Sequence, residues 1–369
     1  MIANSRRALA LSLLLLAACK IAACKPAGAP AGPAEVQLAT DLPRPVVDTI
    51  LQLAERSGAP RTEQIAGLSL GSSVLAAPEV VRVAASQTDG GPAPAELPLA
   101  AAPATQGTSG DLRWDLEPYG AILAAARGEL APIPSSAQDV PGLWRDPAGT
   151  WVAVGGRAEV LLVGIEALGD HGAPVRFTAL TESWLKGKVA VVAPTGGASL
   201  AHFAALYEAW GTERMEAWLA GLKANEVQLL DSDDAVRNAV VTGAATVGIL
   251  SSDEAAKAAA SAAKVLVVYP NQRSIGVFVW PTALSRPKSS PHADAAATLA
   301  ERLGDRATEQ LLVARLPGFL PLRANIPVPP GVSSAANLVV ISVDPARIVE
   351  EIARRRSDLA DWAAGAKQK

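Results

Sequence analysis

Short apolar runs alternate with segments of helical apolar spacing along most of the chain, and this alternation predicts the fold class. Runs typical of buried strands fall at residues 36–40, 151–154, 158–163, 188–193, 226–230, 245–250 and 265–269, with another extended segment at 277–280. Apolar residues at helical spacing fall at residues 45–57, 119–128, 199–210, 213–223, 235–241, 253–263, 291–303, 305–314 and 345–364. Strands and helices that alternate in this way predict an α/β fold with mainly parallel strands and helices on both sheet faces.

The pattern breaks between residues 69 and 110, where Ala, Pro, Gly and Ser dominate. Proline removes backbone hydrogen-bond donors and glycine adds conformational freedom, so this composition disfavours helices and strands. We therefore predict a long irregular insert at about residues 70–110.

The first 24 residues have the pattern of an export signal. A basic start at residues 6–7 precedes an apolar run over residues 8–18, which is shorter than the roughly 20 residues of a membrane-spanning helix. Leu-Ala-Ala-Cys at residues 16–19 matches the lipobox of bacterial lipoproteins, so residues 1–18 are predicted to be a cleaved signal peptide and Cys19 the lipidated residue. A second match ends at Cys24 and is the alternative, although its apolar run would contain a lysine.

Residues 19–34 are predicted to form a lipid-anchored, flexible tether, because Pro, Gly and Ala occur there without apolar periodicity. Cys19 and Cys24 are the two cysteines of the chain, so the folded part offers no disulfide and no cysteine ligand for a metal. The predicted location is the cell envelope, with the exported protein anchored in a bacterial membrane on its periplasmic or extracellular face.

Composition and net charge exclude several classes of protein. Of the 369 residues, 50% are hydrophobic and 19% are charged, and the formal net charge is -3. Ample apolar content excludes a disordered chain, and basic residues dispersed among acidic ones exclude a strongly basic nucleic-acid binder. The length predicts two packed units, at about 100 to 200 residues per domain.

The most informative loop is Pro-Thr-Gly-Gly-Ala-Ser at residues 194–199, which follows a buried strand and opens a helix. Glycines allow close backbone approach, and free N–H groups with the helix dipole favour an anion, so Gly197 and Ser199 are candidate anion ligands. His202 lies in the first turn of the same helix and is a further candidate. The alternatives are a plain turn in which Ser199 caps the helix and a structural role for His202.

Two acidic groups are candidates for holding a hard cation. Asp233 and Asp234 lie at the next strand-to-helix junction, and Asp253 with Glu254 follows one unit later. Carboxylates gathered at strand ends can bind such a cation, but Asp is also favoured at helix starts by capping and by the dipole. Both interpretations stay open.

A third candidate lies where regular structure resumes after the insert, because Trp114 and Tyr119 flank Glu117 there. Aromatic rings and a carboxylate at a strand end can line a ligand cleft, and core packing explains Trp114 equally well. The sequence contains no HExxH or P-loop pattern, so we expect no enzymatic activity and no bound cofactor. The identity of any metal stays open.

Six segments in the same order resemble the ferric-iron solute-binding proteins of ABC transporters, which belong to the type II periplasmic binding family (extracellular solute-binding protein family 1). The segments are residues 144–151 with 156–158, 184–190, 222–225 with 236–237, 268–272, 290–292 and 320–323. The first four are similar to the family patterns DPxGxW with ARARV, WKGKVA, LKANGV with VRD, and VFPDQ. The resemblance covers the chain from about residue 111 to its end and identifies it as a divergent member.

The resemblance implies two α/β lobes, a ligand cleft between them, and hinge strands near residues 158–163 and 277–280. Lobe 1 would comprise residues 35–160 and 277–369, and lobe 2 would comprise residues 161–276. The residues expected to contact the ligand are Thr40, Trp114, Glu117, Arg157, Gly197, Ser199, His202, Asp233, Asp234 and Tyr269.

The sequence departs from the family pattern at positions that would contact the ligand. Many relatives hold iron with neighbouring tyrosines, whereas Tyr119, Tyr207 and Tyr269 are the three tyrosines here and none is adjacent to another. Ligation by a tyrosine pair is therefore not supported. Several polar positions of the family pattern are also apolar in this chain, as at residues 163–165 and 281–283.

The function that the resemblance implies is a solute-binding lipoprotein of an ABC importer. It would capture ferric iron, an iron chelate or a small anion in the interlobe cleft and deliver it to a membrane permease driven by an ATPase, with Fe(III) as a candidate transported ligand. The alternative is a scaffold that has lost its ligand and acts as a surface or partner-binding lipoprotein. Nucleic acid is not an expected partner.

Overall fold

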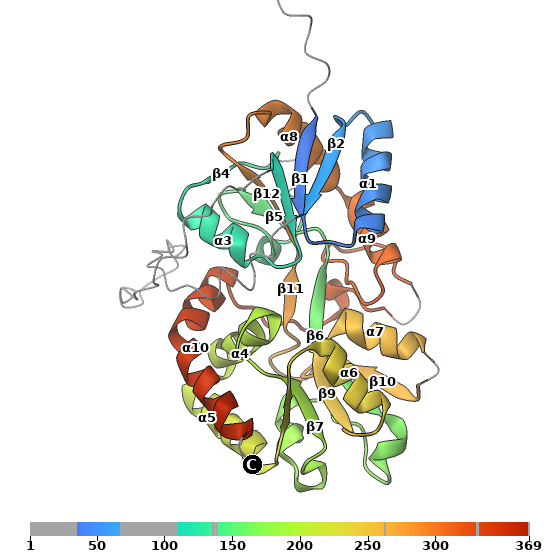
Figure 1. The fold of residues 1–369 in the computed structure, drawn as a ribbon, viewed down its shortest axis with the longest axis vertical. Helices are drawn as coiled ribbons and strands as arrows, with labels where there is room; N and C mark the ends of the chain where they lie inside the picture. The colour runs from blue at the N-terminus through green and yellow to red at the C-terminus, as the bar shows by residue number, and fades with distance from the viewer. Residues whose placement is uncertain are drawn as a thin grey trace, which may run out of the picture. The chain divides into compact units, whose positions relative to one another are not determined.

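The computed structural model describes residues 35–66, 110–134, 137, 139–261, 263–329 and 332–367. The predicted signal peptide, the tether with Cys19 and Cys24, and nearly all of the predicted insert lie outside the described residues. Residues Ala34–Lys369 form one compact unit, and two sheets with their helices make up its two lobes (Figure 1).

The first lobe contains a sheet in the order β2-β1-β3-β12-β4, with β5 paired to β12. Its strands are β1 (Val36–Thr40), β2 (Thr62–Ala66), β3 (Leu112–Asp115), β4 (Leu130–Ala131), β5 (Trp151–Val152) and β12 (Ala283–Pro287). Its helices are α1 (Arg44–Arg56), α3 (Tyr119–Ala126), α8 (Ala293–Leu303) and α9 (Arg306–Arg315). The strand β1 runs parallel to β2 and β3, whereas β12 runs antiparallel to β3, β4 and β5.

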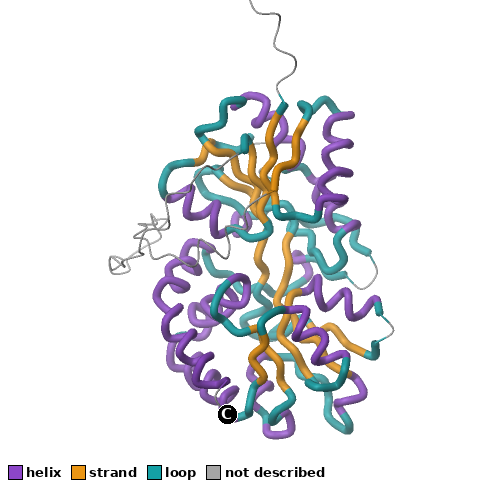
Figure 2. Tube along the Cα trace, in the orientation of Figure 1, coloured by secondary structure: helices purple, strands orange, loops and turns teal. Residues whose placement is uncertain are grey.

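The second lobe contains a sheet in the order β10-β6-β9-β7-β8, with β11 paired to β6. Its strands are β6 (Gly156–Gly164), β7 (Val189–Val192), β8 (Gln228–Leu230), β9 (Val247–Ser251), β10 (Val265–Val268) and β11 (Val279–Pro281). Its helices are α4 (Gly197–Trp210), α5 (Thr212–Ala224), α6 (Asp233–Val241) and α7 (Ser252–Ala260). Figure 2 shows the strands in the interior of each lobe, with helices around them.

Two chain crossings join the lobes where the sequence predicts hinges. The chain leaves the first sheet after β5 and enters β6, and it returns through β11 into β12 (Figure 1). The start of β6 pairs with β11, where Arg157 lies opposite Trp280. Both crossings are buried, since Ala158, Val160, Val279 and Trp280 are at most 4% exposed.

At the end of the second sheet that lies nearest the crossings, helices begin where the local sequence favours a helix start. The hydroxyl oxygen of Ser232 accepts a hydrogen bond from the backbone N–H of Ala235 at 3.1 Å and caps α6. Asp233 and Asp234 occupy the first turn of α6, and Asp253 occupies the first turn of α7. Acidic side chains are favoured in the first turn of a helix by the helix dipole. Carboxylates at this edge of the sheet are therefore expected both from the helix starts and from the predicted cation site.

The last helix, α10 (Pro345–Lys367), packs mainly along α4 of the second lobe and also contacts α3 of the first. The Trp362 ring N–H donates to the Leu219 carbonyl at 3.1 Å, and the Arg355 guanidinium lies 4.4 Å from the Tyr207 ring centroid. The predicted lobe 1 includes residues 277–369, but the contacts of α10 lie largely with the second lobe. Among the helices of the described ranges, none is long and apolar enough to cross a membrane.

The prediction of mainly parallel sheets is wrong, because β6 and β12 run antiparallel to their neighbours. The crossings cause this, since a strand that returns from the other lobe enters the sheet from the opposite end. Four strands were also not predicted, namely β2, β3, β4 and β12. The sequence of β12, Ala-Leu-Ser-Arg-Pro, offers no strand pattern because its second half is polar and ends in proline.

Candidate functional site

A set of charged side chains gathers where the two lobes meet. Glu117 follows β3 of the first lobe, Arg157 and Glu159 lie at the start of β6, and Asp233 and Asp253 begin α6 and α7 of the second lobe. Mutual electrostatic effects place them close together, because Arg157 acts on Glu117, Glu159 and Asp233. We call these five residues the junction cluster.

Arg157 is the cation of the junction cluster. One of its terminal nitrogens, Nη1, lies 3.6 Å from Oδ1 of Asp253, and the side chain is 12% exposed. Its guanidinium carbon lies 5.0 Å from the ring centroid of Trp280 and 5.9 Å from that of Phe319. Within the described part of the chain, its buried Nε has no hydrogen-bond partner, so part of its donor capacity is left for another molecule.

Burial dominates the ionisation of the carboxyl groups. It raises the pKa of Glu117 and of Asp233 and raises that of Glu159 well above its usual range, while the charge of Arg157 offsets part of the rise. Neighbouring acidic groups add to it, as Asp233 does for Glu159. Loss of hydration and repulsion between like charges both disfavour the ionised form of these groups.

Tyr119, the first residue of α3, adds a phenol to the cluster. The residue is 1% exposed, and its hydroxyl finds no hydrogen-bond partner among the residues that the structure describes. Burial raises the pKa of Tyr119 well above its usual value, and the charges of Glu117 and Glu159 raise it further. A buried hydroxyl without a partner costs about 1–3 kcal/mol, so this group is placed to bond with a ligand.

The charge balance at the junction favours a positively charged ligand. Asp41 of the first lobe also acts on Glu117, and its Oδ1 accepts a hydrogen bond from the backbone N–H of Leu116 at 2.7 Å. Five carboxyl groups therefore interact with the guanidinium of Arg157. Burial and mutual repulsion favour the protonated form of Glu117, Glu159 and Asp233, and a cation bound beside them would favour their ionised form and pair with it.

The predicted anion loop lies beside a carboxylate of the protein itself. Gly197 has a φ of 56°, and a Cβ on this residue would lie 4.0 Å from Oε1 of Glu117. The hydroxyl of Ser199 donates to the carbonyl of Val192 at 2.7 Å. Ser199 thus does not cap the helix, whose N-cap is Gly196. A small anion at this helix end would meet the repulsion of Glu117.

His202 lies in the core rather than at the junction. It is 1% exposed and contacts the rings of Phe177, Phe203 and Phe278 at centroid distances of 4.8, 5.8 and 5.8 Å. Burial lowers the pKa of His202 to about 3, so the ring is neutral at physiological pH. His202 therefore has the structural role that the sequence analysis gave as the alternative.

Four other predicted contacts are used within the fold. Asp234 is exposed and pairs with Arg237 of its own helix. The hydroxyl of Thr40 donates to the carbonyl of Trp114 at 2.6 Å, and the indole N–H of Trp114 donates to Thr282 at 3.1 Å. The hydroxyl of Tyr269 bonds to Ser333.

Glu159 and Trp280 join the predicted Glu117, Arg157 and Asp233 at the junction but were not predicted as ligand residues. Tyr119 and Asp253, which the sequence offered as candidates beside Glu117 and Asp233, also lie there. For Glu159 a signal existed, because it is a lone carboxylate in the otherwise apolar run Ala158–Val163, and carboxylates are seldom fully buried unless they are paired. For Trp280 no signal existed, because an aromatic residue at a strand end is most often packing material.

No three His, Cys, Asp or Glu side chains are grouped to hold a metal ion among the residues described. The carboxylates of the junction cluster therefore lie near one another without forming a preformed coordination shell. A metal ion would require side-chain movement or ligands of its own.

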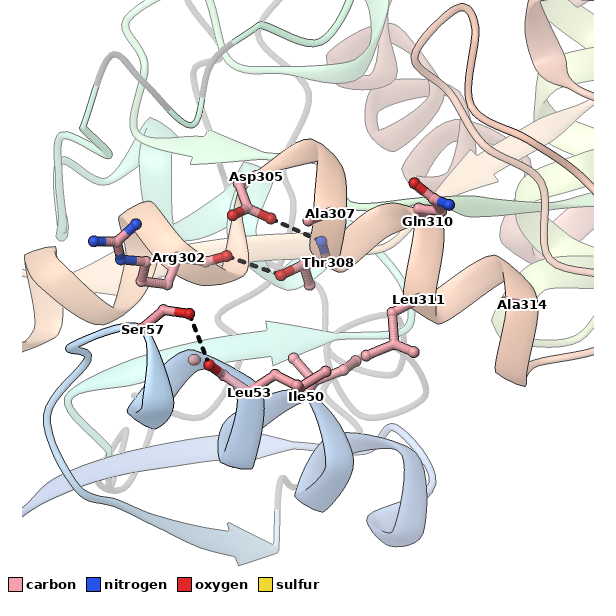
Figure 3. A pocket seen from close by; sticks show the side chains of 11 residues that line it. Ile50, Leu53, Ser57, Arg302, Asp305, Ala307, Thr308, Gln310, Leu311 and Ala314 are labelled. Atoms are coloured by element: carbon pink, nitrogen blue, oxygen red, sulfur yellow. Dashed lines mark hydrogen bonds between the residues drawn. The ribbon is translucent and has the colours of Figure 1, made fainter.

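A pocket lies in the first lobe between α1 and α9, with a volume of about 330 Å³ (Figure 3). Several of its polar groups are bonded to one another, since Thr308 donates to the backbone carbonyl of Arg302 at 2.8 Å and Ser57 donates to that of Leu53 at 3.0 Å. Asp305 accepts from the backbone N–H of Thr308 at 2.7 Å. Besides apolar surface, the pocket presents the side chains of Arg302 and Gln310.

Comparison with known proteins gives a family match and a set of similar folds. The family described as "Bacterial extracellular solute-binding protein" matches residues 127–347. No curated protein sequence matches the chain.

Solved structures share the fold over most of the chain. Iron-bound HitA from Pseudomonas aeruginosa has a TM-score of 0.70 at 18% identity, covering 89% of this chain and 99% of its own. The Trichodesmium IdiA/FutA structure with iron and citrate has a TM-score of 0.67 at 17% identity, covering 91% and 100%. The Bordetella ferric binding protein has a TM-score of 0.65 at 22% identity, covering 90% and 99%. The predicted fold class, two α/β lobes of the type II periplasmic binding fold, is confirmed.

Proposed function

Because the chain belongs to the bacterial extracellular solute-binding proteins, we propose that it captures a small solute at the junction of its two lobes for an ABC importer. The observation that carries this proposal is the set of buried polar groups at the junction without hydrogen-bond partners among the described residues. They are the hydroxyl of Tyr119, Nε of Arg157, Oε2 of Glu117 and Oδ1 of Asp253. Buried polar groups are normally paired, and a bound solute would supply the missing partners.

Delivery of the solute to a permease driven by an ATPase follows from the same family membership. Ferric iron and an iron chelate are candidate solutes, because the similar structures are described as iron-bound, as bound to iron and citrate, and as ferric binding. The surplus of carboxyl groups supports a cation over the small anion that the loop at Gly197 suggested from sequence.

We also propose that the protein is a lipoprotein anchored through Cys19, with Cys24 as the alternative. The lipobox and the apolar run before it support this anchoring. Replacement Cys19→Ser should move the protein from the membrane to the soluble fraction of fractionated cells. Retention of the variant at the membrane, lost only when Cys24 is also replaced, would transfer the lipid to Cys24.

Thermal unfolding in the presence of candidate solutes tests the capture function. A solute that binds only the folded protein raises its stability by about 2.7 kcal/mol at a hundred times Kd, which is a readily measured rise in Tm. The panel comprises ferric citrate, ferric nitrilotriacetate, inorganic phosphate and small organic cations. Absence of any rise across the panel would favour the scaffold that has lost its ligand.

A further inference from the structure

Resting on the proposed capture function, we infer that the solute is a small organic cation whose ammonium or guanidinium group donates hydrogen bonds to Glu117 and Tyr119 at the lobe junction. The likeness to ferric-binding structures extends to the fold, at identities of 16 to 22%. The side chains of the junction cluster therefore have to decide the chemistry of the ligand.

The first step concerns charge. Carboxyl groups of both lobes face the junction: Asp41 and Glu117 from the first, Asp233 and Asp253 from the second, and Glu159 from the crossing strand. Arg157 is the guanidinium that acts on them, and it is already balanced in part by Asp253 at 3.6 Å. A monocation entering here stabilises the ionised form of the carboxyl groups whose pKa burial raises, whereas an anion raises their pKa further.

The second step concerns hydrogen bonds, and it is independent of the charge count. The hydroxyl of Tyr119 is fully buried, lies in the field of Glu117 and Glu159, and has no partner in the described ranges. Oε2 of Glu117 and Oδ1 of Asp253 are buried acceptors without hydrogen-bond partners there as well, although Oδ1 of Asp253 lies 3.6 Å from Nη1 of Arg157. An ammonium group offers three N–H donors and a guanidinium offers five, which matches a site with several free acceptors.

The third step concerns the aromatic side chains beside Arg157. Trp280 and Phe319 present ring faces to the guanidinium of Arg157 at 5.0 and 5.9 Å. Aromatic faces beside carboxylates are a setting that favours organic cations through cation–π attraction. Arg157 itself makes use of this attraction at the edge of the junction.

A bare metal ion fits less well. Three His, Cys, Asp or Glu side chains do not come together as a coordination shell in the described part of the chain.

Isothermal titration calorimetry on the whole folded protein tests this inference. The probes are methylammonium, putrescine and agmatine as organic cations, with ferric citrate and inorganic phosphate as the contrasting ligands. We expect at least one organic cation to bind, and Glu117→Gln to weaken it by at least tenfold because a charge-assisted hydrogen bond becomes a neutral one. Tyr119→Phe, which removes one hydroxyl, should weaken binding by a smaller factor.

Asp234→Asn is the matched control, because Asp234 neighbours Asp233 in sequence yet is exposed and paired with Arg237; its affinity should equal that of the parent. Binding of ferric citrate or phosphate with no organic cation would overturn the inference and leave the capture function standing. Binding of organic cations that is insensitive to both Glu117→Gln and Tyr119→Phe would also overturn it. Failure of every ligand would overturn the capture function itself. Circular dichroism of each variant separates lost binding from lost folding.

Discussion

At the residue scale, burial determines what a polar side chain can do in this protein. His202 and Glu117 were both predicted ligand contacts, but His202 is surrounded by phenylalanine rings and Glu117 faces other carboxyl groups. The face of the helix on which a histidine lies decides whether the ring belongs to the core or to a binding site. The sequence places His202 in the first turn of its helix and says nothing about which way the ring points.

His202 gives a prediction about acid stability. In the unfolded chain the imidazole has its ordinary pKa of 6.5, and burial lowers its folded pKa to about 3. Between these values the unfolded state binds the extra proton, so the contribution of His202 to the free energy of unfolding should fall by roughly 1 kcal/mol per pH unit as pH drops below 6.5. His202→Phe should flatten this slope, measured by urea unfolding at pH 7, 5.5 and 4. Exposed His171→Gln is the control and should keep the slope of the parent; an unchanged slope in His202→Phe would contradict the assignment.

At the element scale, a buried ion pair fixes α9 to the segment that follows it. Arg323 and Glu309 are both fully buried, and Nη1 of Arg323 lies 2.7 Å from Oε2 of Glu309. Arg323 also donates to the carbonyl of Gly304 at 2.6 Å, and Glu309 accepts from the N–H of Leu322 at 2.6 Å. Every one of these bonds joins the ends of α8 and α9 to residues 322–323.

Removing one partner of this pair should be costly. Arg323→Met leaves a buried carboxylate without its counter-charge, and we expect a loss of about 3–5 kcal/mol in the free energy of unfolding, measured by urea denaturation. Glu309→Met added to Arg323→Met should recover part of the loss, because the uncompensated charge is then gone. Exposed Arg347→Met, which breaks a 3.6 Å contact with Glu208, should cost less than about 1 kcal/mol. Equal losses in the buried and exposed variants would contradict this account.

Elements with a strong local signal could be predicted, and elements that depend on distant partners could not. The apolar run of β7 and the periodic α1 are where the pattern places them. The strand β12 exists because β11 carries the chain back to the first sheet and β3 pairs with it. The junction cluster is similar, since Glu117 and Asp253 are 136 positions apart and meet only because the chain folds into two lobes.

At the scale of the whole molecule, the lobes are also joined away from the two crossings. The hydroxyl of Ser252, at the start of α7, donates to the carbonyl of Gly318 at 2.6 Å and accepts from the N–H of Ala158 at 3.0 Å. Gly318 follows α9 of the first lobe. The phenyl ring of the adjacent Phe319 contacts Arg157, so this link borders the junction cluster and connects its geometry to the approach of the two lobes.

Gly318→Ala should loosen that link. Gly318 has a φ of 82°, and a Cβ there would lie 2.2 Å from the backbone oxygen of Ser252, so the α7 start and the α9 loop have to separate. Gly58→Ala is a matched control, because Gly58 has a φ of 91° but no atom within 4 Å of the added Cβ. Both variants carry the left-handed strain of about 1–2 kcal/mol, and Gly318→Ala alone carries the clash between lobes. Small-angle scattering should therefore show a larger radius of gyration for Gly318→Ala than for Gly58→Ala, and equal radii would mean that the Ser252–Gly318 contact does not hold the lobes together.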